Sequence, residues 1–300
     1  MPLNPEIIKN DLAEAIKSTD LTLDEALKNF QTGTMTLIRN PRRQIRPLAV
    51  GKNMPTAVNI NIGTSGDLND PDLELKKVEV AEKWGADTLM DLSTGGDLPA
   101  IRKVLLAESK LPLGTVPIYE MYVTAMRKYG SFSKMQAEEM LDIIESQAVE
   151  GVDFMTIHSG VTRSAIEVLK RNSRVLGIVS RGGSFTAGWI AKNGMENPLF
   201  ERFDDLLAIL SRYRVVLSLG DGLRPGAIFD ATDQAQIHEL STLADLRRRA
   251  MEAGVQVMIE GPGHVPLNQI RANVELEKSL CGGAPFYVLG PLPLDVAPGY

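Results

Sequence analysis

The sequence contains little cysteine and no excess of positive charge. A single cysteine, Cys281, occurs among the 300 residues, so no disulfide can form within the chain, and this usage fits a reducing compartment. The net charge is -6 and the pI is about 5.3. Such a chain has no basic field to attract a phosphate backbone, and we therefore expect no nucleic-acid partner.

Long apolar runs are also missing. No stretch approaches the roughly 20 consecutive apolar residues that a membrane-spanning helix needs. Residues 1–17 lack the apolar core of a signal peptide. The sequence thus predicts a cytoplasmic protein with no membrane partner. Its length is enough to bury a large core, and barrels of roughly this size commonly form one unit.

The sequence does contain eight short apolar runs, each of which stops at glycine and polar residues. The runs are residues 58–63, 88–94, 113–119, 154–160, 176–183, 215–222, 255–264 and 284–291. They are rich in Val, Ile and Leu without strict alternation, which is typical of parallel strands buried on both faces. The runs predict the strands of an α/β fold, a (β/α)8 TIM-type barrel with its active site at the carboxyl ends of the strands.

The stretches between the runs predict helices. Apolar residues recur there at three- and four-residue spacing among charges, in residues 74–84, 137–151, 204–213, 233–254 and 267–280. Gly85, Gly151 and Gly254 fall where a helix must end and turn back towards a strand. An open doubly wound sheet would alternate in the same way, but eight units with functional groups at almost every strand end favour a closed barrel.

A different kind of segment precedes the first run. Residues 5–18 and 23–30 predict two short amphipathic helices, and the following residues predict an extended arm that closes the barrel floor or contacts a second subunit. We therefore divide the chain into an N-terminal arm, residues 1–50, and a barrel, residues 51–300. The basic cluster of the arm, formed by Arg39, Arg42, Arg43 and Arg46, is predicted to be an interface or a solvated face rather than an anion site.

The last run is not followed by a helix within the chain. A barrel without its final helix would expose apolar strand surface to water, so we expect the natural protein to continue beyond Tyr300.

Polar side chains at the ends of the runs would converge at one mouth of a barrel. They are Asn61, Asp91, Tyr119, His158, Ser180, Arg181, Asp221, Arg224, Glu260, His264 and Tyr287. The turns SRGG, residues 180–183, and GDGLRPG, residues 220–226, combine small residues with an arginine that can bind phosphate bidentately. Together they indicate a phosphorylated small molecule, although either turn alone fits a simple tight turn equally well.

Several of these residues have a purely structural alternative. His158 could complete a buried hydrogen-bond network, and Asp91 and Asp221 could stabilise loops. Met90, within a run, is typical of core filling. Glu260 and the histidine four residues later are separated by Gly-Pro-Gly, which precludes an ordinary helix, and a shaped loop of this kind can hold a metal ligand or an acid–base pair.

Ten motifs carry a resemblance that generic barrels do not share. They are NINIGTSGDL, GADTLMDLSTGGDL, GTVPIYE, GVDFMTIHSGVTR, IVSRGGSF, ENPLFERFD, LSLGDGLRPG, DATDQAQIHEL, GVQVMIEGPGHVPL and APFYVLGPLPLDVAPGY. From about residue 59 to residue 300 the chain resembles the phosphomethylpyrimidine synthase family of thiamin biosynthesis, and EGPGHVP and SLGDGLRPG are its most specific motifs. That family is a non-standard radical S-adenosylmethionine (SAM) group built on a β/α barrel, with aminoimidazole ribotide as substrate.

The resemblance implies roles for particular residues of this chain. The implied substrate contacts are Asn61, Met90, Tyr119, His158, Ser180, Arg181, Gly182, Asp221, Gly222, Leu223, Arg224, Glu260 and Tyr287. His264 is implied as one of two ligands of a zinc or similar divalent ion, with the second family histidine beyond Tyr300. The family's three-cysteine motif for a [4Fe-4S] cluster is absent from these 300 residues, and Cys281 cannot replace it. The resemblance also implies an electron donor and a homodimer.

The implied chemistry is a rearrangement begun by a radical. In the family the cluster cleaves SAM, and the resulting 5'-deoxyadenosyl radical abstracts a hydrogen from the ribotide. The barrel's task is to hold the ribose near the radical and to exclude water. We expect this chain to be the substrate-binding barrel, which binds the ribotide without turnover on its own.

The product is a separate question. We favour the paralogue 5-hydroxybenzimidazole synthase of anaerobic cobalamin biosynthesis, because the chain lacks a long N-terminal extension and departs from the usual wording at HSGVTR, SFTAGWIAKNG and GPLPLDVAPGY. The alternative is phosphomethylpyrimidine synthase, which uses the same ribotide. A ribotide-binding barrel without radical chemistry is a further alternative. An ordinary phosphosugar aldolase or isomerase is disfavoured because no lysine stands at a strand end, although metal-dependent members need none.

Overall fold

The sheet at the centre of the molecule is entirely parallel and follows the order of the chain. The structure is a computed structural model that describes residues 5–289. In the described sheet each strand pairs with the next one along the sequence, from β3 to β9. The strands are β3 (Asn59–Ile62), β4 (Thr88–Asp91), β5 (Leu113–Thr115), β6 (Phe154–Ile157), β7 (Val216–Leu219), β8 (Val257–Gly261) and β9 (Phe286–Val288).

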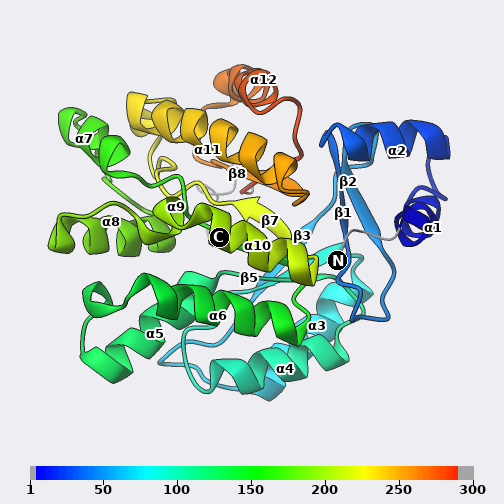
Figure 1. Cartoon of the computed structure of the whole chain (residues 1–300), viewed down its shortest axis with the longest axis horizontal. Helices are drawn as coiled ribbons and strands as arrows, with labels where there is room; N and C mark the ends of the chain where they lie inside the picture. Colours follow the sequence, from blue (N-terminus) through cyan, green and yellow to red (C-terminus); the bar gives the residue numbers. More distant parts are fainter. Residues whose placement is uncertain (1–4, 290–300) are drawn as a thin grey trace.

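Helices surround this sheet, as Figure 1 shows. The α-helices are α3 (Pro71–Lys83), α4 (Leu98–Glu108), α5 (Pro117–Tyr129), α6 (Ala137–Glu150), α7 (Arg163–Arg171), α8 (Arg181–Asn193), α9 (Pro198–Glu201), α10 (Phe203–Tyr213), α11 (Gln234–Glu252) and α12 (Ile270–Leu280). Short 3-10 helices are η1 (Phe132–Lys134), η2 (Ile228–Asp230) and η3 (Leu267–Gln269). Buried apolar side chains of these helices and of the strands form the main core, which extends from Ile38 to Ala284.

The predicted α/β fold of TIM type is confirmed. The helices expected from apolar spacing form close to their predicted bounds, and Gly85, Gly151 and Gly254 have φ values of 80°, 99° and 74° at the ends of three of them. Only a residue without a side chain adopts such angles at little cost, which is why glycine stands at these turns. The third run is shorter than predicted, since β5 ends at Thr115 and Pro117 begins α5.

One of the eight predicted strands is wrong. Residues 176–183 form no strand, and β6 pairs directly with β7, so that the described sheet has seven strands. The backbone N–H of Val175 donates to the Asp230 carboxylate at 2.7 Å instead of to a neighbouring strand. The Ser180 hydroxyl then accepts the N–H of Gly183 at 3.1 Å and caps the start of α8. Hydrogen bonds to a side-chain carboxylate and to a helix-capping hydroxyl thus replace the backbone hydrogen bonds of the predicted strand.

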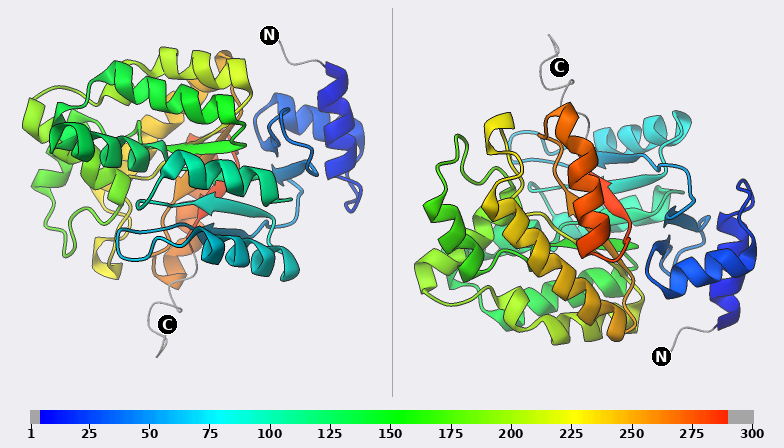
Figure 2. Two further views of the ribbon diagram at one scale, coloured as in Figure 1. Left: turned by 90° about the horizontal axis from the view of Figure 1, so that it is seen from below. Right: turned by 90° about the horizontal axis from the view of Figure 1, so that it is seen from above.

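The N-terminal segment forms an element of its own beside the barrel. It consists of α1 (Pro5–Ala15), α2 (Leu23–Gln31) and an antiparallel hairpin of β1 (Met35–Ile38) and β2 (Leu48–Gly51). These elements enclose a small apolar core around Leu12, Ala26 and Met35. Both views of Figure 2 show them to one side of the helix-covered sheet. The division of the chain at residue 50 stays a prediction.

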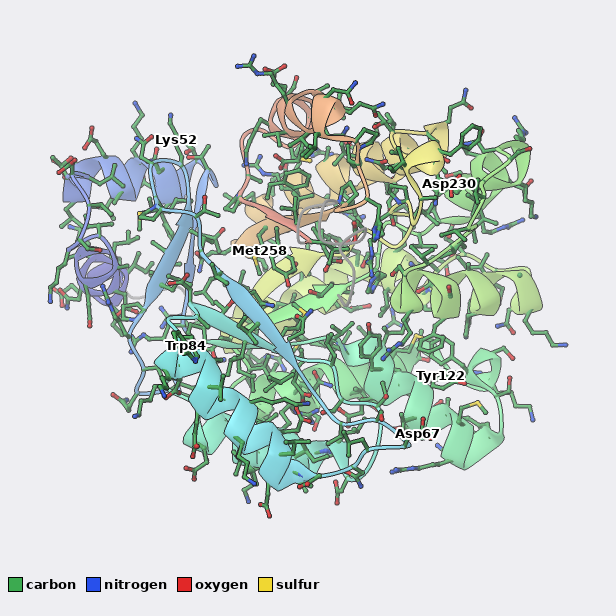
Figure 3. All side chains as sticks on the ribbon, turned by 180° about the vertical axis from the view of Figure 1, so that it is seen from behind. Lys52, Asp67, Trp84, Tyr122, Asp230 and Met258 are labelled. Atoms are coloured by element: carbon green, nitrogen blue, oxygen red, sulfur yellow. The ribbon has the colours of Figure 1, made fainter. Side chains whose placement is uncertain are left out.

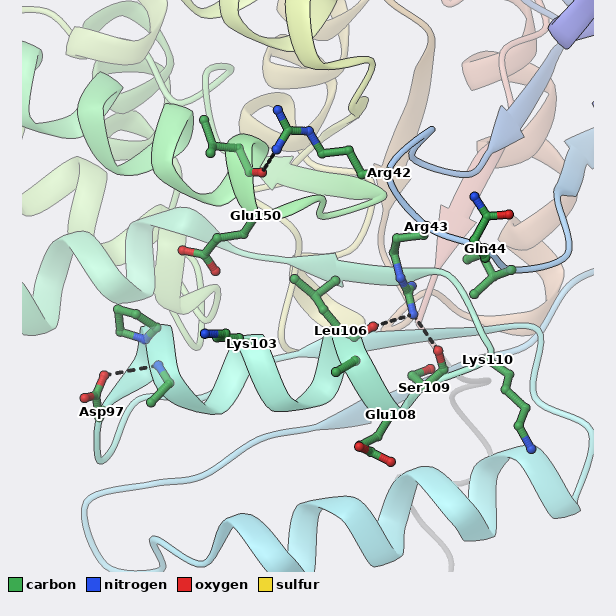
Figure 4. A pocket seen from close by; sticks show the side chains of 15 residues that line it. Arg42, Arg43, Gln44, Asp97, Lys103, Leu106, Glu108, Ser109, Lys110 and Glu150 are labelled. Carbon is green, nitrogen blue, oxygen red and sulfur yellow. Dashed lines mark hydrogen bonds between the residues drawn. The ribbon is translucent and has the colours of Figure 1, made fainter.

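The arm packs against the amino end of the barrel, which fits the first of its two predicted roles, and contact with a second subunit stays a prediction. Thr36 Oγ1 donates to the carbonyl of Val257 at 2.9 Å, where β8 begins. Arg43, predicted on an interface or a solvated face, is instead buried, and its guanidinium donates to Asp153 at 2.6 Å. The same group donates to the carbonyl oxygens of Leu106, near the end of α4, at 3.2 Å and of Ser109 at 2.6 Å (Figure 4). It also donates to the carbonyl oxygen of Leu111 at 2.8 Å.

The end of the chain is described as far as residue 289. The predicted last run therefore appears as the short strand β9, and residues 290–300 lie outside the described residues. Within the described part, none of the helices combines the length and the apolar character needed to cross a membrane.

Candidate substrate site at the carboxyl ends of the strands

His158 stands one residue beyond β6 and forms the buried centre of the site. Its Nε2 lies 3.4 Å from Ser180 Oγ, and an added Cβ at Gly182 would overlap the imidazole ring. The start of α8 is therefore packed directly against this ring. Burial, reinforced by the positive charge of Arg224, lowers the pKa of His158 to about 3, so that the imidazole is neutral at physiological pH.

The two glycine-rich turns contact each other through their backbones. A Cβ on Gly183 would overlap the carbonyl oxygen of Gly222, and a Cβ on Gly222 would overlap the Val161 side chain. Close approach of the SRGG and GDG segments thus requires glycine at both positions. This packing accounts for the glycines and brings the start of α8 next to the end of β7.

Charged groups of the β7 and β8 ends meet beside this contact. The backbone N–H of Asp221 donates to Glu260 Oε2 at 3.2 Å, and Arg224 Nη1 donates to Asp221 Oδ1 at 2.9 Å. The Arg181 guanidinium lies over the ring of Tyr119, 4.9 Å from its centroid. Residues from the starts of α5 and α8 and from the ends of β7 and β8 are therefore gathered in one place, as the strand-end rule predicted.

The electrostatics of this cluster favour protonated acids. Burial raises the pKa of both Asp221 and Glu260, and the Asp221 charge raises that of Glu260 further, against the opposing charge of Arg224. Two buried carboxyl groups so placed cannot both ionise readily, so their titrations depend on each other. Burial also raises the pKa of Tyr119, which the charges of Arg181 and Arg224 oppose.

The β3 side of the sheet contributes the remaining predicted contacts. Asn61 pairs in register with Met90, and Glu260 pairs with Tyr287. Asn61 is exposed, whereas Met90 is buried in the main core, which fits its alternative as core filling. Burial raises the pKa of Tyr287, with a further contribution from the Glu260 charge, so its hydroxyl stays protonated.

Glu239 is a site residue that the sequence did not reveal. It lies in α11, and its Oε2 accepts the backbone N–H of Leu223 at 2.7 Å, which fixes the loop after β7. Burial, followed by the charge of Asp221, raises the pKa of Glu239 to about 8. The only signal in the sequence is its spacing, which puts the Glu239 carboxylate on the same helix face as the apolar residues Leu243 and Leu246.

The described residues do not by themselves form a complete metal or cluster site. His264 follows β8 and is half-buried, but no group of three or more His, Cys, Asp or Glu side chains in residues 5–289 is arranged to hold a metal ion. Cys281 is fully buried, and burial raises the pKa of its thiol to about 12. A protonated, enclosed thiol is not a cluster ligand, so the thiol of this chain offers no site for iron.

One prominent cavity lies away from these residues. A groove of about 970 Å³ on the amino-end side (Figure 4) is lined by the arm and α4, including Arg42, Lys103 and Lys110, and by no predicted site residue. The convergence at the carboxyl ends, and not this groove, therefore defines the candidate site.

Comparison with known families identifies the family of this chain. The model of the radical SAM ThiC family matches residues 4–300. The chain belongs to this family. The resemblance noted from the motifs is confirmed, and this radical SAM ThiC protein is an enzyme of the radical SAM type.

Similar relatives of this ThiC chain are named phosphomethylpyrimidine synthase. The protein from Dehalococcoides mccartyi is 52% identical over 295 residues, which cover 98% of this chain and 68% of the relative. The protein from Methanocaldococcus jannaschii is 49% identical, covering 98% and 69%, and that from Carboxydothermus hydrogenoformans is 54% identical, covering 92% and 65%. The ThiC chain thus spans about two thirds of the length of these relatives.

Solved structures add little to this assignment. Dihydropteroate synthase from Xanthomonas albilineans aligns with 84% of the ThiC chain and 92% of its own, at 14% identity and a TM-score of 0.37. A likeness of that size carries no argument about fold or function.

Proposed function

We propose that this chain is the substrate-binding barrel of a phosphomethylpyrimidine synthase, an enzyme that rearranges aminoimidazole ribotide into the pyrimidine phosphate of thiamin. The relatives at 49–54% identity bear that name. They favour this alternative over the 5-hydroxybenzimidazole synthase that the sequence wording favoured. The observation that carries the proposal is the convergence of Arg181, Arg224, Asp221 and Glu260 around Tyr119 in a chain of this family.

The phosphate of the ribotide is proposed to bind Arg181. Arg224 is already paired with Asp221 at 2.9 Å, whereas Arg181 forms no ion pair among the described residues and stacks on Tyr119. It also begins α8, whose first backbone N–H groups carry partial positive charge. A free guanidinium beside a helix N-terminus is well suited to a phosphate dianion.

The remaining predicted contacts are proposed to orient the base and the ribose. Asn61, His158 and Tyr287 present neutral polar groups at neutral pH, which bind sugar hydroxyls and ring nitrogens without competing charge. Burial raises the pKa of both Asp221 and Glu260, which suits them to supply or take up a proton during the rearrangement. In the family a [4Fe-4S] cluster and SAM supply the radical, and the ligands of that cluster lie outside this chain.

Other parts of the function are proposals on the resemblance alone. His264 is proposed as one ligand of a zinc or similar divalent ion. The whole enzyme is proposed to be a cytoplasmic homodimer that takes electrons from a donor. Elemental analysis of the purified chain before and after His264→Ala checks the metal, since loss of bound zinc in the variant alone supports the assignment.

Binding of aminoimidazole ribotide to the 300-residue chain tests the proposal. Titration calorimetry should show binding by the wild type and a loss of about ten- to a hundredfold in affinity for Arg181→Ala, because a charge-assisted contact to phosphate is removed. Arg171→Ala, at the end of α7, removes the same charge from an exposed position and serves as the matched control. Absence of binding by the wild type would contradict the proposal.

The product requires a second experiment. An anaerobic assay of the full-length protein with SAM, reductant and the ribotide should give a phosphorylated pyrimidine by mass spectrometry. A hydroxylated benzimidazole would restore the paralogue instead. The 300-residue chain alone should give neither product, since a single thiol cannot hold a cluster.

A further inference from the structure

The first and last strands of the sheet are joined by side chains. The ladder runs from β3 to β9 in sequence order, and no backbone pairing closes β9 onto β3 among the described residues. We call this gap the seam. Asn61 lies on one side of the seam and Tyr287 on the other. No backbone hydrogen bonds between their two strands therefore fix these two proposed ribotide contacts relative to each other, unlike the contacts on neighbouring strands.

Asn59 spans the seam through a fully used amide group. Its Nδ2 donates to Tyr287 Oη at 2.9 Å and to Asn61 Oδ1 at 3.0 Å. Its Oδ1 accepts the hydroxyl of Thr88 at 2.9 Å. One side chain thereby connects β3, β4 and β9. In this orientation of the amide, the carbonyl oxygen faces Thr88 and the NH2 group faces the seam.

Packing alone does not hold the seam together. A cavity of about 580 Å³ adjoins it, and Asn59, Thr88 and Tyr287 are all part of the cavity wall. Met258, labelled in Figure 3, lines the same cavity from β8. Side chains that border a void lack contacts on that side, so the position of the Tyr287 ring depends more strongly on its hydrogen bonds.

We propose that Asn59 is a positioning residue of the ribotide site, which sets the Asn61 amide and the Tyr287 hydroxyl relative to each other across the seam. The proposal rests on the proposed function, since it takes both residues as ribotide contacts. Asn59 itself acts through its two partners. Asn61 lies two residues further along the strand, on the same face, which is what allows one amide to reach both groups.

The decisive measurement is ribotide affinity per folded molecule, from calorimetry of the 300-residue chain with binding stoichiometry as the check on folding. Asn59→Val keeps a β-branched shape suited to a strand and removes all three hydrogen bonds. Each such bond is worth about two- to tenfold in an equilibrium constant, so the ribotide should bind about tenfold more weakly. Thr88→Val is the matched control. It removes only the hydrogen bond from the buried Thr88 hydroxyl to Asn59 and leaves both bonds across to Tyr287 and Asn61, so affinity should change by about twofold or less.

A double-mutant cycle separates positioning from a general structural role. In the Tyr287→Phe background the hydroxyl is gone, and Asn59→Val should then cost only about threefold because one of its two routes to the ligand is already lost. Asn59→Asp should fall between wild type and Asn59→Val, since a carboxylate can accept from Thr88 and Tyr287 but cannot donate to Asn61. Strictly multiplicative effects in the cycle, or wild-type affinity for Asn59→Val, would overturn the proposal.

Failure of the proposed function gives a different pattern. If the wild type does not bind the ribotide, the proposed site is wrong, and the proposed positioning role is wrong with it. If the wild type binds and Asn59→Val binds equally well, only the role of Asn59 is wrong. Hydrogen exchange of a peptide spanning β9 provides a ligand-free check that the seam is held as described, since Asn59→Val should accelerate it and Thr88→Val should not.

Discussion

Asp153, at the amino end of the sheet, and His158, at its carboxyl end, are both buried, but they differ in their hydrogen bonds. At the amino end, Asp153 is fully buried and accepts from Arg43 at 2.6 Å, from the N–H of Asn40 at 2.7 Å and from the N–H of Leu113 at 2.8 Å. At the carboxyl end, the buried atoms His158 Nδ1 and Ser159 Oγ have no hydrogen-bond partner among the described residues. The carboxylate of Asp153 is thus satisfied by the protein itself, and these two atoms at His158 and Ser159 are not.

The difference in hydrogen bonding has a cost in stability at the carboxyl end. A buried polar atom without a partner costs free energy, and native proteins leave few of them. At the carboxyl end such atoms coincide with carboxyl groups whose pKa values are raised by burial, namely Asp221, Glu239 and Glu260. A polar ligand can supply partners to groups of this kind, which supports the proposed site at the carboxyl end.

The largest expected effect is at the amino end. Asp153→Ala leaves the Arg43 guanidinium buried without its carboxylate, which should lower the free energy of unfolding by about 3–5 kcal/mol. Urea unfolding followed by circular dichroism measures this loss. Ribotide affinity of the folded fraction should stay unchanged, and a variant that unfolds normally but loses the ribotide would break the comparison.

A pair of glycine substitutions in α8 comes next. Gly183→Ala places a methyl group against the Gly222 carbonyl and should cost about 1–3 kcal/mol together with ribotide affinity. Gly188→Ala, in the same helix, meets nothing within 4 Å and should stabilise the protein by about 0.5–1 kcal/mol. Thermal unfolding and calorimetry of both variants check the pair. Equal behaviour of the two would mean that the turns are not in contact.

The pKa of His158 predicts how stability responds to acid. Its value is about 3 in the folded protein and 6.5 ordinarily, so below pH 6.5 the unfolded chain takes up a proton that the folded chain refuses. Stability from this residue is therefore complete above pH 6.5 and falls with pH, by about 2 kcal/mol at pH 5. His158→Asn should remove this share of the pH dependence in urea titrations at pH 7 and 5. The same slope in both proteins would show that the imidazole is not buried.

Glu239 predicts the opposite sign over a neighbouring range. Its pKa is about 8 in the folded protein and 4.5 ordinarily, so its contribution is complete below pH 4.5 and is lost as the pH rises towards 8. Wild type should lose at most about 1.4 kcal/mol from this group between pH 6 and 7. Glu239→Gln keeps an acceptor for the Leu223 N–H without titrating, and should flatten this part of the profile. A profile unchanged by the substitution would refute the raised pKa.

Much of the fold was predictable because it follows from local patterns. Helices such as residues 137–151 show an apolar stripe, and their ends carry glycine for a simple conformational reason. The run 176–183 was mispredicted because its apolar residues look the same whether or not a neighbouring strand accepts them. The deciding partner, Asp230, lies more than fifty residues away, and no local pattern reveals it.

The site was predictable to the extent that it lies at strand ends. The positions of Asp221, Arg224 and Glu260 follow from parallel strands that finish at one edge, and the structure brings them together. Glu239 and Asn59 were missed because one lies in mid-helix and the other begins a strand. Both act on neighbours that are distant in sequence, at Leu223 and at Tyr287, and such pairing emerges only in three dimensions.

The position of the arm at the start of the chain affects the order in which its contacts form. Its hydrogen bonds to the barrel join Arg43 to Leu106, 63 positions apart, and to Asp153, 110 positions apart, and join Thr36 to Val257, 221 positions apart. During synthesis the arm leaves the ribosome before these partners, so its contacts with the barrel form only after the partners have been made. The small apolar core around Leu12 and Met35 consists of arm residues alone, so burying these side chains does not require a barrel residue.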